Sequence, residues 1–219
     1  LATVAAVAFA VGGWVVDTAA DADLSKCRQV DRGGTSIVFA GDGSRLGYIR
    51  SDEARTPVKV KKVPIDLRYA TVAIEDERFY KHKGVDYEGI IRAAVKNATA
   101  KGKTVQGGST LTMQLVRNLY TEDRSQDFKR KIREAKLAEE LENAHPGREG
   151  KKWILTKYLN SVPYGTNDGK EAIGIQAAAR AYFNKRARDL TLSESALLAG
   201  LPQAPSDYNP FREPARATA

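Results

Sequence analysis

The stretch AIEDERFYKHKG contains three consecutive acidic residues, Glu75, Asp76 and Glu77. If this part of the chain is helical, side chains follow one another at about 100°, and the apolar stripe is centred on Leu67 and Ile74. Glu75 then lies at the margin of that stripe, whereas Asp76 points to the opposite side. A carboxylate at the edge of an apolar surface is partly desolvated, which can tune it toward general-base work. The alternative is an ordinary amphipathic helix with a charged flank.

A second carboxylate stands among cations in the helix expected from Phe128 to Glu142. Its spacing places Arg130 and Glu134 on one face with Leu137 and Leu141. The opposite face is also apolar, so we expect the helix to be largely buried. Because buried charges are costly unless they are paired or used, Arg130 and Glu134 form either a structural ion pair or part of a site.

Between these segments lies QGGSTLTMQLVRN, in which Gly107 and Gly108 precede a helix expected from Ser109 to about Tyr120. A glycine turn at a helix N-terminus presents free backbone N–H groups to an anion. The nucleotide-binding P-loop pattern is absent. A run of basic residues follows, which forms either a solvated face or a pocket for a pyrophosphate: Arg117, Arg124, Lys129, Arg130, Lys131 and Arg133.

The elements that position these residues are mostly helical. A β-hairpin is expected from Ile37 to Ile49 around Gly41-Asp42-Gly43, with a short extended piece at 57–60. Further helices are expected over 64–78, from a cap at Asp86 through Val95, over 150–160, over 171–183, and from Thr191 to Leu201 with Glu194 completing a capping box. The domain boundaries predicted are an anchor segment at 1–16, a linker with the hairpin at 17–62, the main domain at 63–212 and a tail at 213–219.

The composition of the chain limits the kinds of partner that it can bind. Of its 219 residues, 35 are Lys or Arg and 27 are Asp or Glu, so the net charge is +8. Such a surface attracts nucleic acid, an anionic membrane leaflet or a phosphorylated substrate. A single cysteine excludes an internal disulfide, and two histidines make a zinc site improbable.

The N-terminal run LATVAAVAFAVGGWVV carries no charge and is followed by Asp17, Asp21 and Asp23. A spanning helix needs about 20 apolar residues, so we interpret this run as the outer end of a membrane anchor or a signal sequence. A buried core segment is the alternative. Acidic rather than basic flanking residues favour an extracytoplasmic position for the rest of the chain.

Together these stretches resemble the bacterial peptidoglycan glycosyltransferases, the transglycosylase domain of bifunctional penicillin-binding proteins and its monofunctional relatives. The resemblance covers about 63–210 and rests on four motifs in the order of that family. The first two comprise Glu75, Asp76, Phe79, His82 and Gly84, then Gly107, Gly108, Ser109, Thr110, Thr112 and Gln114. The other two comprise Arg130, Lys131 and Glu134, then Lys151 or Lys152, Ile154, Leu155, Tyr158, Leu159 and Asn160.

Two features depart from the family pattern. Met113 stands where the second motif has its first glutamine, and the Arg-rich fifth motif would fall beyond Ala219. No S-x-x-K sequence occurs, so the chain lacks a penicillin-sensitive transpeptidase site.

The resemblance implies a mainly α, lysozyme-like helical domain with a small membrane-proximal lobe and a short β-hairpin fringe near the N-terminus. It implies that lipid II is joined to a lipid-linked glycan chain through a β-1,4 link, with inversion and loss of undecaprenyl pyrophosphate. Glu75 would be the general base, and Glu134 would orient cations or the second sugar. Contacts to the substrate and its pyrophosphate would come from Arg92, Gln106, Ser109, Thr110, Gln114, Arg117, Arg124, Arg130, Lys131 and Arg133. Structural roles would fall to Asp76, Phe79, His82, Gly84, Tyr158 and Asn160.

No cofactor is required by this scheme, and a divalent cation is possible but is not implied. The partners expected are lipid II, the lipid-linked glycan, the bacterial membrane and moenomycin-type inhibitors, with no nucleic acid. The location expected is the bacterial cell membrane, with one N-terminal anchor and the catalytic domain on the extracytoplasmic face. Three alternatives stay open: a lysozyme-like glycan hydrolase, an inactive scaffold that binds lipid II, and a basic nucleic-acid-binding module.

Overall fold

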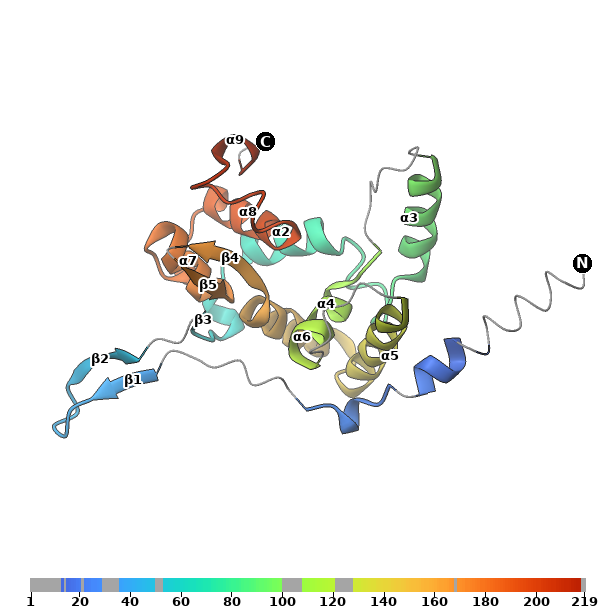
Figure 1. Cartoon of the computed structure of the whole chain (residues 1–219), viewed down its shortest axis with the longest axis horizontal. Helices are drawn as coiled ribbons and strands as arrows, with labels where there is room; N and C mark the ends of the chain where they lie inside the picture. Colours follow the sequence, from blue (N-terminus) through green and yellow to red (C-terminus); the bar gives the residue numbers. More distant parts are fainter. Residues whose placement is uncertain are drawn as a thin grey trace, which may run out of the picture. The chain divides into compact units, whose positions relative to one another are not determined.

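The computed structural model describes residues 13, 15–20, 22–28, 36–49, 53–99, 108–120, 128–167 and 169–217, and these residues are mainly α-helical (Figure 1). The chain divides into two compact units. The first unit comprises Leu1–Val30 and Arg78–Lys151, and the second comprises Asp31–Glu77 and Lys152–Ala219. The prediction of a mainly α chain with a β-hairpin near its N-terminus is therefore confirmed, whereas the domain boundaries at 16, 62 and 212 stay predictions.

The first unit is built on a helix pair. Helix α4 packs against α5, and η1 contacts α5 as well, where the Leu24 backbone N–H donates to Glu140 Oε2 at 2.9 Å. The core side of α4 is apolar and includes Leu111, Leu115 and Val116. The elements of this unit are η1 (Leu24–Lys26), α3 (Tyr87–Thr99), α4 (Leu111–Tyr120), α5 (Phe128–Ala144) and the start of α6 (Gly147–Ser161).

The second unit combines helices with two small sheets. Strands β1 and β2 pair antiparallel as the expected hairpin, and a second sheet has the order β3-β5-β4, with β3 parallel to β5 and β4 antiparallel to it. Helix α7 contacts this second sheet, and α2 packs against α8 (Figure 1). The elements are β1 (Ser36–Phe39), β2 (Arg45–Ile49), β3 (Glu53–Arg55), η2 (Val60–Lys62), α2 (Ile65–Glu75), the rest of α6, β4 (Pro163–Asn167), β5 (Lys170–Ile173), α7 (Ile175–Phe183), η3 (Ala187–Asp189), α8 (Leu192–Gly200), η4 (Leu201–Gln203) and α9 (Pro214–Ala217).

Helix caps follow the sequence closely. The Asp86 carboxylate accepts from the Gly89 N–H at 3.0 Å, and Thr191 with Glu194 forms the predicted capping box. The cap of α4 lies one residue later than expected, because Thr110 rather than Ser109 accepts from the N–H of Met113, at 3.1 Å.

The β3-β5-β4 sheet corrects two sequence expectations. The extended piece expected at 57–60 lies earlier, at β3, and the helix expected over 171–183 begins only at Ile175 because Lys170–Ile173 forms β5. Gly174 separates β5 from α7 with a φ of +80°, and a Cβ there would stand 2.7 Å from the Asn160 carbonyl oxygen. A glycine is required at this turn.

Two helix faces also differ from expectation. Helix α2 ends at Glu75 rather than continuing to Arg78, and Ile74 is 47% exposed instead of lying at the centre of the apolar stripe. The buried side chains of α2 are those of Leu67, Thr71 and Val72. On α5 the face with Arg130 and Glu134 is buried as predicted, but Phe128 on the second face is exposed.

The anchor interpretation of 1–16 falls almost entirely outside the described residues. Among the residues that the structure does describe, no helix has the length and apolarity needed to cross a membrane.

Candidate active site

Glu75 occupies the last position of α2, in the second unit. At about 100° per residue it falls between Thr71 and Val72 around the helix, and both of those side chains are buried. Glu75 is therefore on the packed face of α2 rather than at its margin, and its own side chain is half-buried. The next residue, Asp76, is buried and leaves the helical conformation, and its N–H closes the helix on the Val72 carbonyl at 3.0 Å.

Two buried tyrosines of the same unit are influenced by the charge of Glu75. Burial raises the pKa of Tyr158 and of Tyr164 well above the usual range, and the Glu75 carboxylate raises both pKa values further. The Tyr164 hydroxyl has no hydrogen-bond partner among the described residues. The Glu75 carboxylate thus lies close enough to these two buried phenols to help keep both of them protonated.

Asn160, a residue of the fourth motif, makes hydrogen bonds to backbone groups of Val58 and of its own helix. Its Oδ1 accepts from the Val58 N–H at 2.8 Å, and its Nδ2 donates to the Val58 carbonyl at 2.9 Å and to the Thr156 carbonyl at 2.8 Å. The side chain therefore pairs with Val58 as a neighbouring strand would, and it fixes the segment that leads into α2.

In the first unit, Glu134 joins two of the predicted cations. Its carboxylate is 1% exposed and accepts two bonds from Arg117, Nε to Oε1 and Nη2 to Oε2, both 2.8 Å. Arg130, one turn earlier on α5, donates to the same Oε1. The Glu134 hydrogen bond raises the pKa of Arg117. Two guanidinium groups and one carboxylate form a fixed cluster with one positive charge in excess.

The other predicted substrate contacts differ in how they are placed. Arg92 on α3 and Lys131 and Arg133 on α5 are exposed, Ser109 and Gln114 are half-buried, and Thr110 is buried. Gln106, Gly107 and Arg124 lie outside the described residues.

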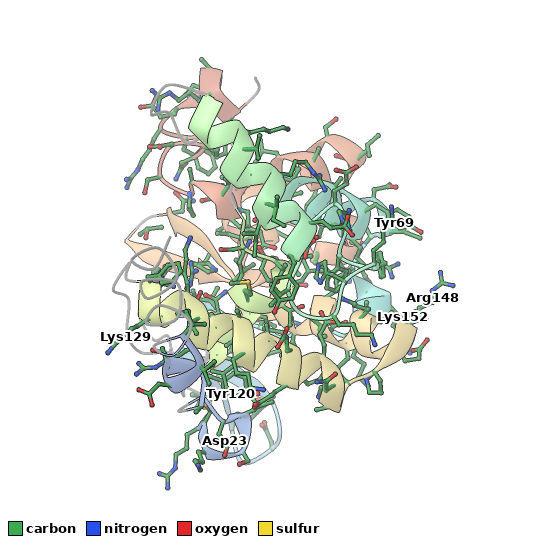
Figure 2. The ribbon with its side chains drawn as sticks, turned by 90° about the vertical axis from the view of Figure 1, so that its right-hand side faces the viewer. Asp23, Tyr69, Tyr120, Lys129, Arg148 and Lys152 are labelled. Carbon is green, nitrogen blue, oxygen red and sulfur yellow. The ribbon has the colours of Figure 1, made fainter. Side chains whose placement is uncertain are left out.

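A buried network that sequence reasoning missed surrounds Glu142. Lys151 is 8% exposed and its Nζ lies 2.7 Å from the Glu142 carboxylate, which also accepts from Thr112 Oγ1 at 2.6 Å. The same ammonium group stands 4.4 Å from the centre of the Phe79 ring. Glu142 was recognisable because it continues the three- and four-residue spacing of Glu134 on α5. Lys152 is exposed and extends outward (Figure 2), so the lysine of the fourth motif that belongs to this network is Lys151.

The first and second motifs meet at a glycine. Thr110 Oγ1 donates to the Gly84 carbonyl at 2.5 Å. Gly84 has a φ of +89°, and a Cβ would stand 2.6 Å from the backbone of Ala138 on α5. The His82 ring lies edge-on to Phe79, with ring centres 6.3 Å apart. These contacts hold the loop against α4 and α5, and the structural roles expected for the motif residues stay predictions.

Met113, which departs from the family pattern, is 4% exposed and lies on the core side of α4. It therefore fills apolar space. Among the described residues no group of three or more His, Cys, Asp or Glu side chains could hold a metal ion.

Comparison with known proteins identifies relatives of this chain. Penicillin-binding protein 2D of Bacillus subtilis is 44% identical over 177 residues, which are 81% of this chain and 24% of that protein. Penicillin-binding protein 1A of Neisseria gonorrhoeae is 42% identical over 180 residues, which are 82% of this chain and 21% of that protein. The chain thus spans about a quarter or less of the length of these relatives. A solved structure, penicillin-binding protein 1A of Haemophilus influenzae, is 24% identical with a TM-score of 0.42, covering 87% of this chain and 17% of that chain.

A family model described as transglycosylase matches residues 42–219. This match includes β2 of the hairpin as well as every predicted motif, so it begins before the boundary at 63 that the motifs suggested. Because this family match covers most of the chain, the chain belongs to the transglycosylase family.

Proposed function

We propose that the chain is a peptidoglycan glycosyltransferase that polymerises lipid II in cell-wall synthesis. The observation that carries this proposal is the transglycosylase match over 42–219 together with Glu75, which sits on the packed face of α2. In the proposed reaction Glu75 removes the proton of the acceptor sugar's 4-hydroxyl as that oxygen attacks the anomeric carbon of the donor. The donor's bond to pyrophosphate breaks, the configuration inverts, and the lipid pyrophosphate leaves.

A pyrophosphate leaving group needs its charge neutralised rather than protonated by a strong acid. Arg117 and Arg130 have guanidinium groups that Glu134 fixes in place, so little side-chain entropy is lost when an anion binds. Exposed Lys131 and Arg133 add charge without that constraint. Glu134 therefore acts as a positioning residue for the cations. Ser109, Thr110 and Gln114, with Arg92, Gln106 and Arg124, complete the proposed set of substrate contacts.

A lipid-linked substrate implies that the enzyme contacts the bacterial membrane in which this substrate is held. Helix α3 supports this proposal, since its side chains Tyr87, Ile91 and Val95 are apolar or amphipathic and exposed. Exposed apolar surface of this kind is typical of membrane or protein contacts. We extend the proposal to one N-terminal anchor, an extracytoplasmic catalytic domain and inhibition by moenomycin-type compounds, and co-sedimentation with anionic vesicles tests the membrane contact.

The central test is polymerisation of labelled lipid II by the purified chain in detergent, with products resolved by length. Glu75→Gln keeps the shape of the side chain but removes the base, so we expect the rate to fall about 10²–10⁴-fold. Glu77→Gln is the matched control, because Glu77 lies two residues away and is exposed. Its rate should stay within about twofold of the wild type.

Three results would contradict the proposal in different ways. Equal rates for the wild type and Glu75→Gln would remove Glu75 from the mechanism. Shortening of a preformed glycan without polymer formation would indicate a hydrolase. Binding of lipid II without turnover by the wild type would indicate a scaffold.

A further inference from the structure

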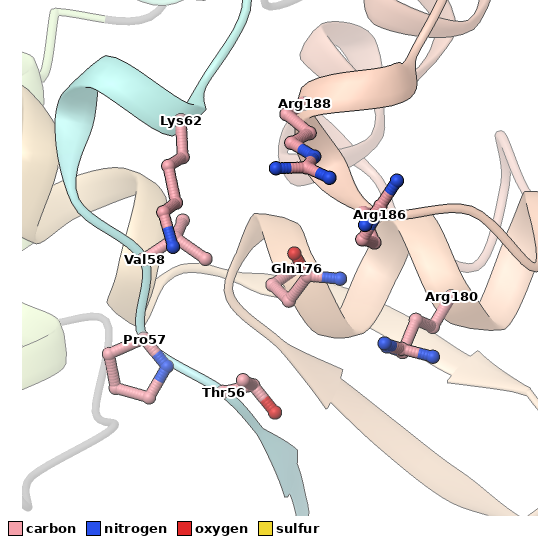
Figure 3. Close-up of a pocket in the computed structure, with 8 residues that line it drawn as sticks. All are labelled: Thr56, Pro57, Val58, Lys62, Gln176, Arg180, Arg186 and Arg188. Atoms are coloured by element: carbon pink, nitrogen blue, oxygen red, sulfur yellow. The ribbon is translucent and has the colours of Figure 1, made fainter.

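The second unit contains a basic pocket that none of the predicted active-site residues lines. Its volume is about 320 Å³, within the range of small-molecule sites. The lining residues come from the segment after β3, from η2, from α7 and from η3: Thr56, Pro57, Val58, Lys62, Gln176, Arg180, Arg186 and Arg188. Figure 3 shows Lys62 and Arg188 reaching into the space from two sides, with Gln176 between them.

The charges in this pocket are not balanced within the protein. Asp189 pairs with Arg186 at 2.7 Å and stands 3.5 Å from Arg188. Neither Lys62 nor Arg180 has an ion-pair partner among the residues that the structure describes. Four cations and one carboxylate leave three positive charges in excess, so the pocket favours a multiply charged anion.

Gln176 supports an anion site in this pocket independently of the charges. It is 7% exposed, and its Oε1 accepts from the Ala187 N–H at 3.2 Å, which fixes the side chain. Its Nε2 is buried and has no hydrogen-bond partner among the described residues. A buried amide donor without a partner is unfavourable, and a bound acceptor oxygen would remove that penalty.

We propose that this pocket binds a phosphoryl group, carried by a phosphorylated small molecule or by a lipid headgroup. The amide of Gln176 donates to one phosphoryl oxygen, and Arg180, Arg188 and Lys62 neutralise the charge. Arginine forks match the geometry of phosphate oxygens. The apolar side chains of Pro57 and Val58 form one wall, against which the organic part of the ligand packs.

The pocket also adjoins the segment that leads into α2. Val58 is held by Asn160 and leads through η2 into α2, which ends at Glu75. A ligand in the pocket therefore contacts the segment that precedes the helix carrying the proposed base, and it lies in the same unit.

The test is titration of the purified chain with pyrophosphate at constant ionic strength, with sodium chloride as the reference salt. The binding signal is the side-chain NH₂ resonance of Gln176 in a ¹⁵N-labelled sample, which separates this pocket from cations elsewhere. Gln176→Glu, read by calorimetry, keeps the acceptor for Ala187 but replaces the donor with a negative charge. We expect it, and Arg180→Gln, to weaken pyrophosphate binding about tenfold or more.

Arg148→Gln is the matched control, since Arg148 is an exposed cation of α6 that points away from the protein (Figure 2). Its affinity should stay within about twofold of the wild type. A melting temperature without ligand that equals the wild-type value shows that each variant is folded.

Two arms separate the sources of the phosphoryl group. A sugar 1-phosphate in solution and phosphatidylglycerol vesicles are each compared between the wild type and Gln176→Glu. A difference in either arm supports the proposal and identifies the source. Unchanged affinity in both arms, a Gln176 resonance that chloride shifts as much as pyrophosphate, or tighter binding of a polyglutamate peptide would overturn it. These outcomes do not depend on lipid II polymerisation, so they stand apart from the test of Glu75.

Discussion

Arg117 and Glu134 face each other through two parallel hydrogen bonds, Nε to Oε1 and Nη2 to Oε2, each 2.8 Å long. Such a bidentate fork adds both strength and a fixed geometry to an arginine–carboxylate pair. It joins α4 to α5 within the first unit, and it makes Arg117 a held cation rather than a mobile one. Glu134 therefore fixes the positions of Arg117 and Arg130, and in the proposed reaction it acts through them.

Glu134→Gln should destabilise the chain by about 3–5 kcal/mol, because it leaves Arg117 and Arg130 close together without their shared carboxylate. Chemical denaturation measures the loss. Glu149→Gln, an exposed change of the same kind on α6, should stay within about 0.5 kcal/mol. Equal effects of the two changes would show that the cluster contributes nothing to stability.

Lys151→Met should destabilise the chain by about 3–5 kcal/mol, because the buried Glu142 loses its cation. The neighbouring Lys152→Met removes the same charge from an exposed site and should cost no more than about 0.5 kcal/mol. Thermal melts of the two variants provide the comparison. A larger loss of stability for Lys152→Met would show that the assignment of Lys151 as the motif lysine is wrong.

Gly84→Ala should fold poorly or not at all, since the residue has a φ of +89° and the new Cβ would meet the backbone of Ala138 at 2.6 Å. Gly147→Ala separates the two causes, because Gly147 has a φ of +73° with nothing within 4 Å of its Cβ position. There we expect only the conformational cost, about 1–2 kcal/mol. Soluble yield and urea midpoints report both effects, and similar midpoints would mean that the contact with α5 relaxes freely.

Tyr164→Phe should leave the free energy of unfolding unchanged or raise it by up to about 1 kcal/mol. The hydroxyl is buried, and among the described residues it has no hydrogen-bond partner to lose. Tyr182→Phe is the contrast, because the Tyr182 hydroxyl donates to the Tyr164 carbonyl at 2.7 Å. That variant should lose about 1 kcal/mol. A marked loss for Tyr164→Phe would reveal a partner for its hydroxyl.

Tyr87 gives a pH prediction. Its hydroxyl donates to Glu139 at 2.7 Å, and this hydrogen bond, with some burial and the charge of Glu139, raises the pKa of Tyr87 to about 12. Because the folded pKa lies above the unfolded value of about 10, the contribution to stability is fully present below pH 10. It is lost as the pH rises through 12. The stability difference between the wild type and Tyr87→Phe should therefore shrink between pH 10 and 12, and denaturation at pH 9 and pH 11.5 checks this.

The features predicted correctly are those that depend on residues close together in the sequence. The hairpin followed from its Gly-Asp-Gly turn, the Thr191 capping box from its spacing, and the buried face of α5 from the recurrence of Arg130, Glu134, Leu137 and Leu141. The ion pair on α5 was also within reach, because adjacent turns of one helix bring Arg130 to Glu134.

The features that the sequence did not predict depend on contacts between residues far apart in the chain. Strands β3 and β5 are three and four residues long, too short for a period to show, and β3 is defined by its pairing with β5, which lies more than 100 residues later in the sequence. The end of α2 at Glu75 and the exposure of Ile74 depend on how α2 packs against α8. Which of two adjacent lysines enters the core depends on Glu142, and no spacing rule distinguishes them.

The bond between Thr110 and Gly84 has an evolutionary consequence. The Thr110 hydroxyl caps α4 and holds the loop that carries the first motif, and this loop fits against the backbone of Ala138 only because Gly84 has no Cβ. Both contacts go to backbone atoms of the partner, so they require a hydroxyl at 110 and a glycine at 84 but no particular side chain at 138. Across relatives we expect the hydroxyl at 110 and the glycine at 84 to be retained together, so that the two motifs are inherited as a single unit.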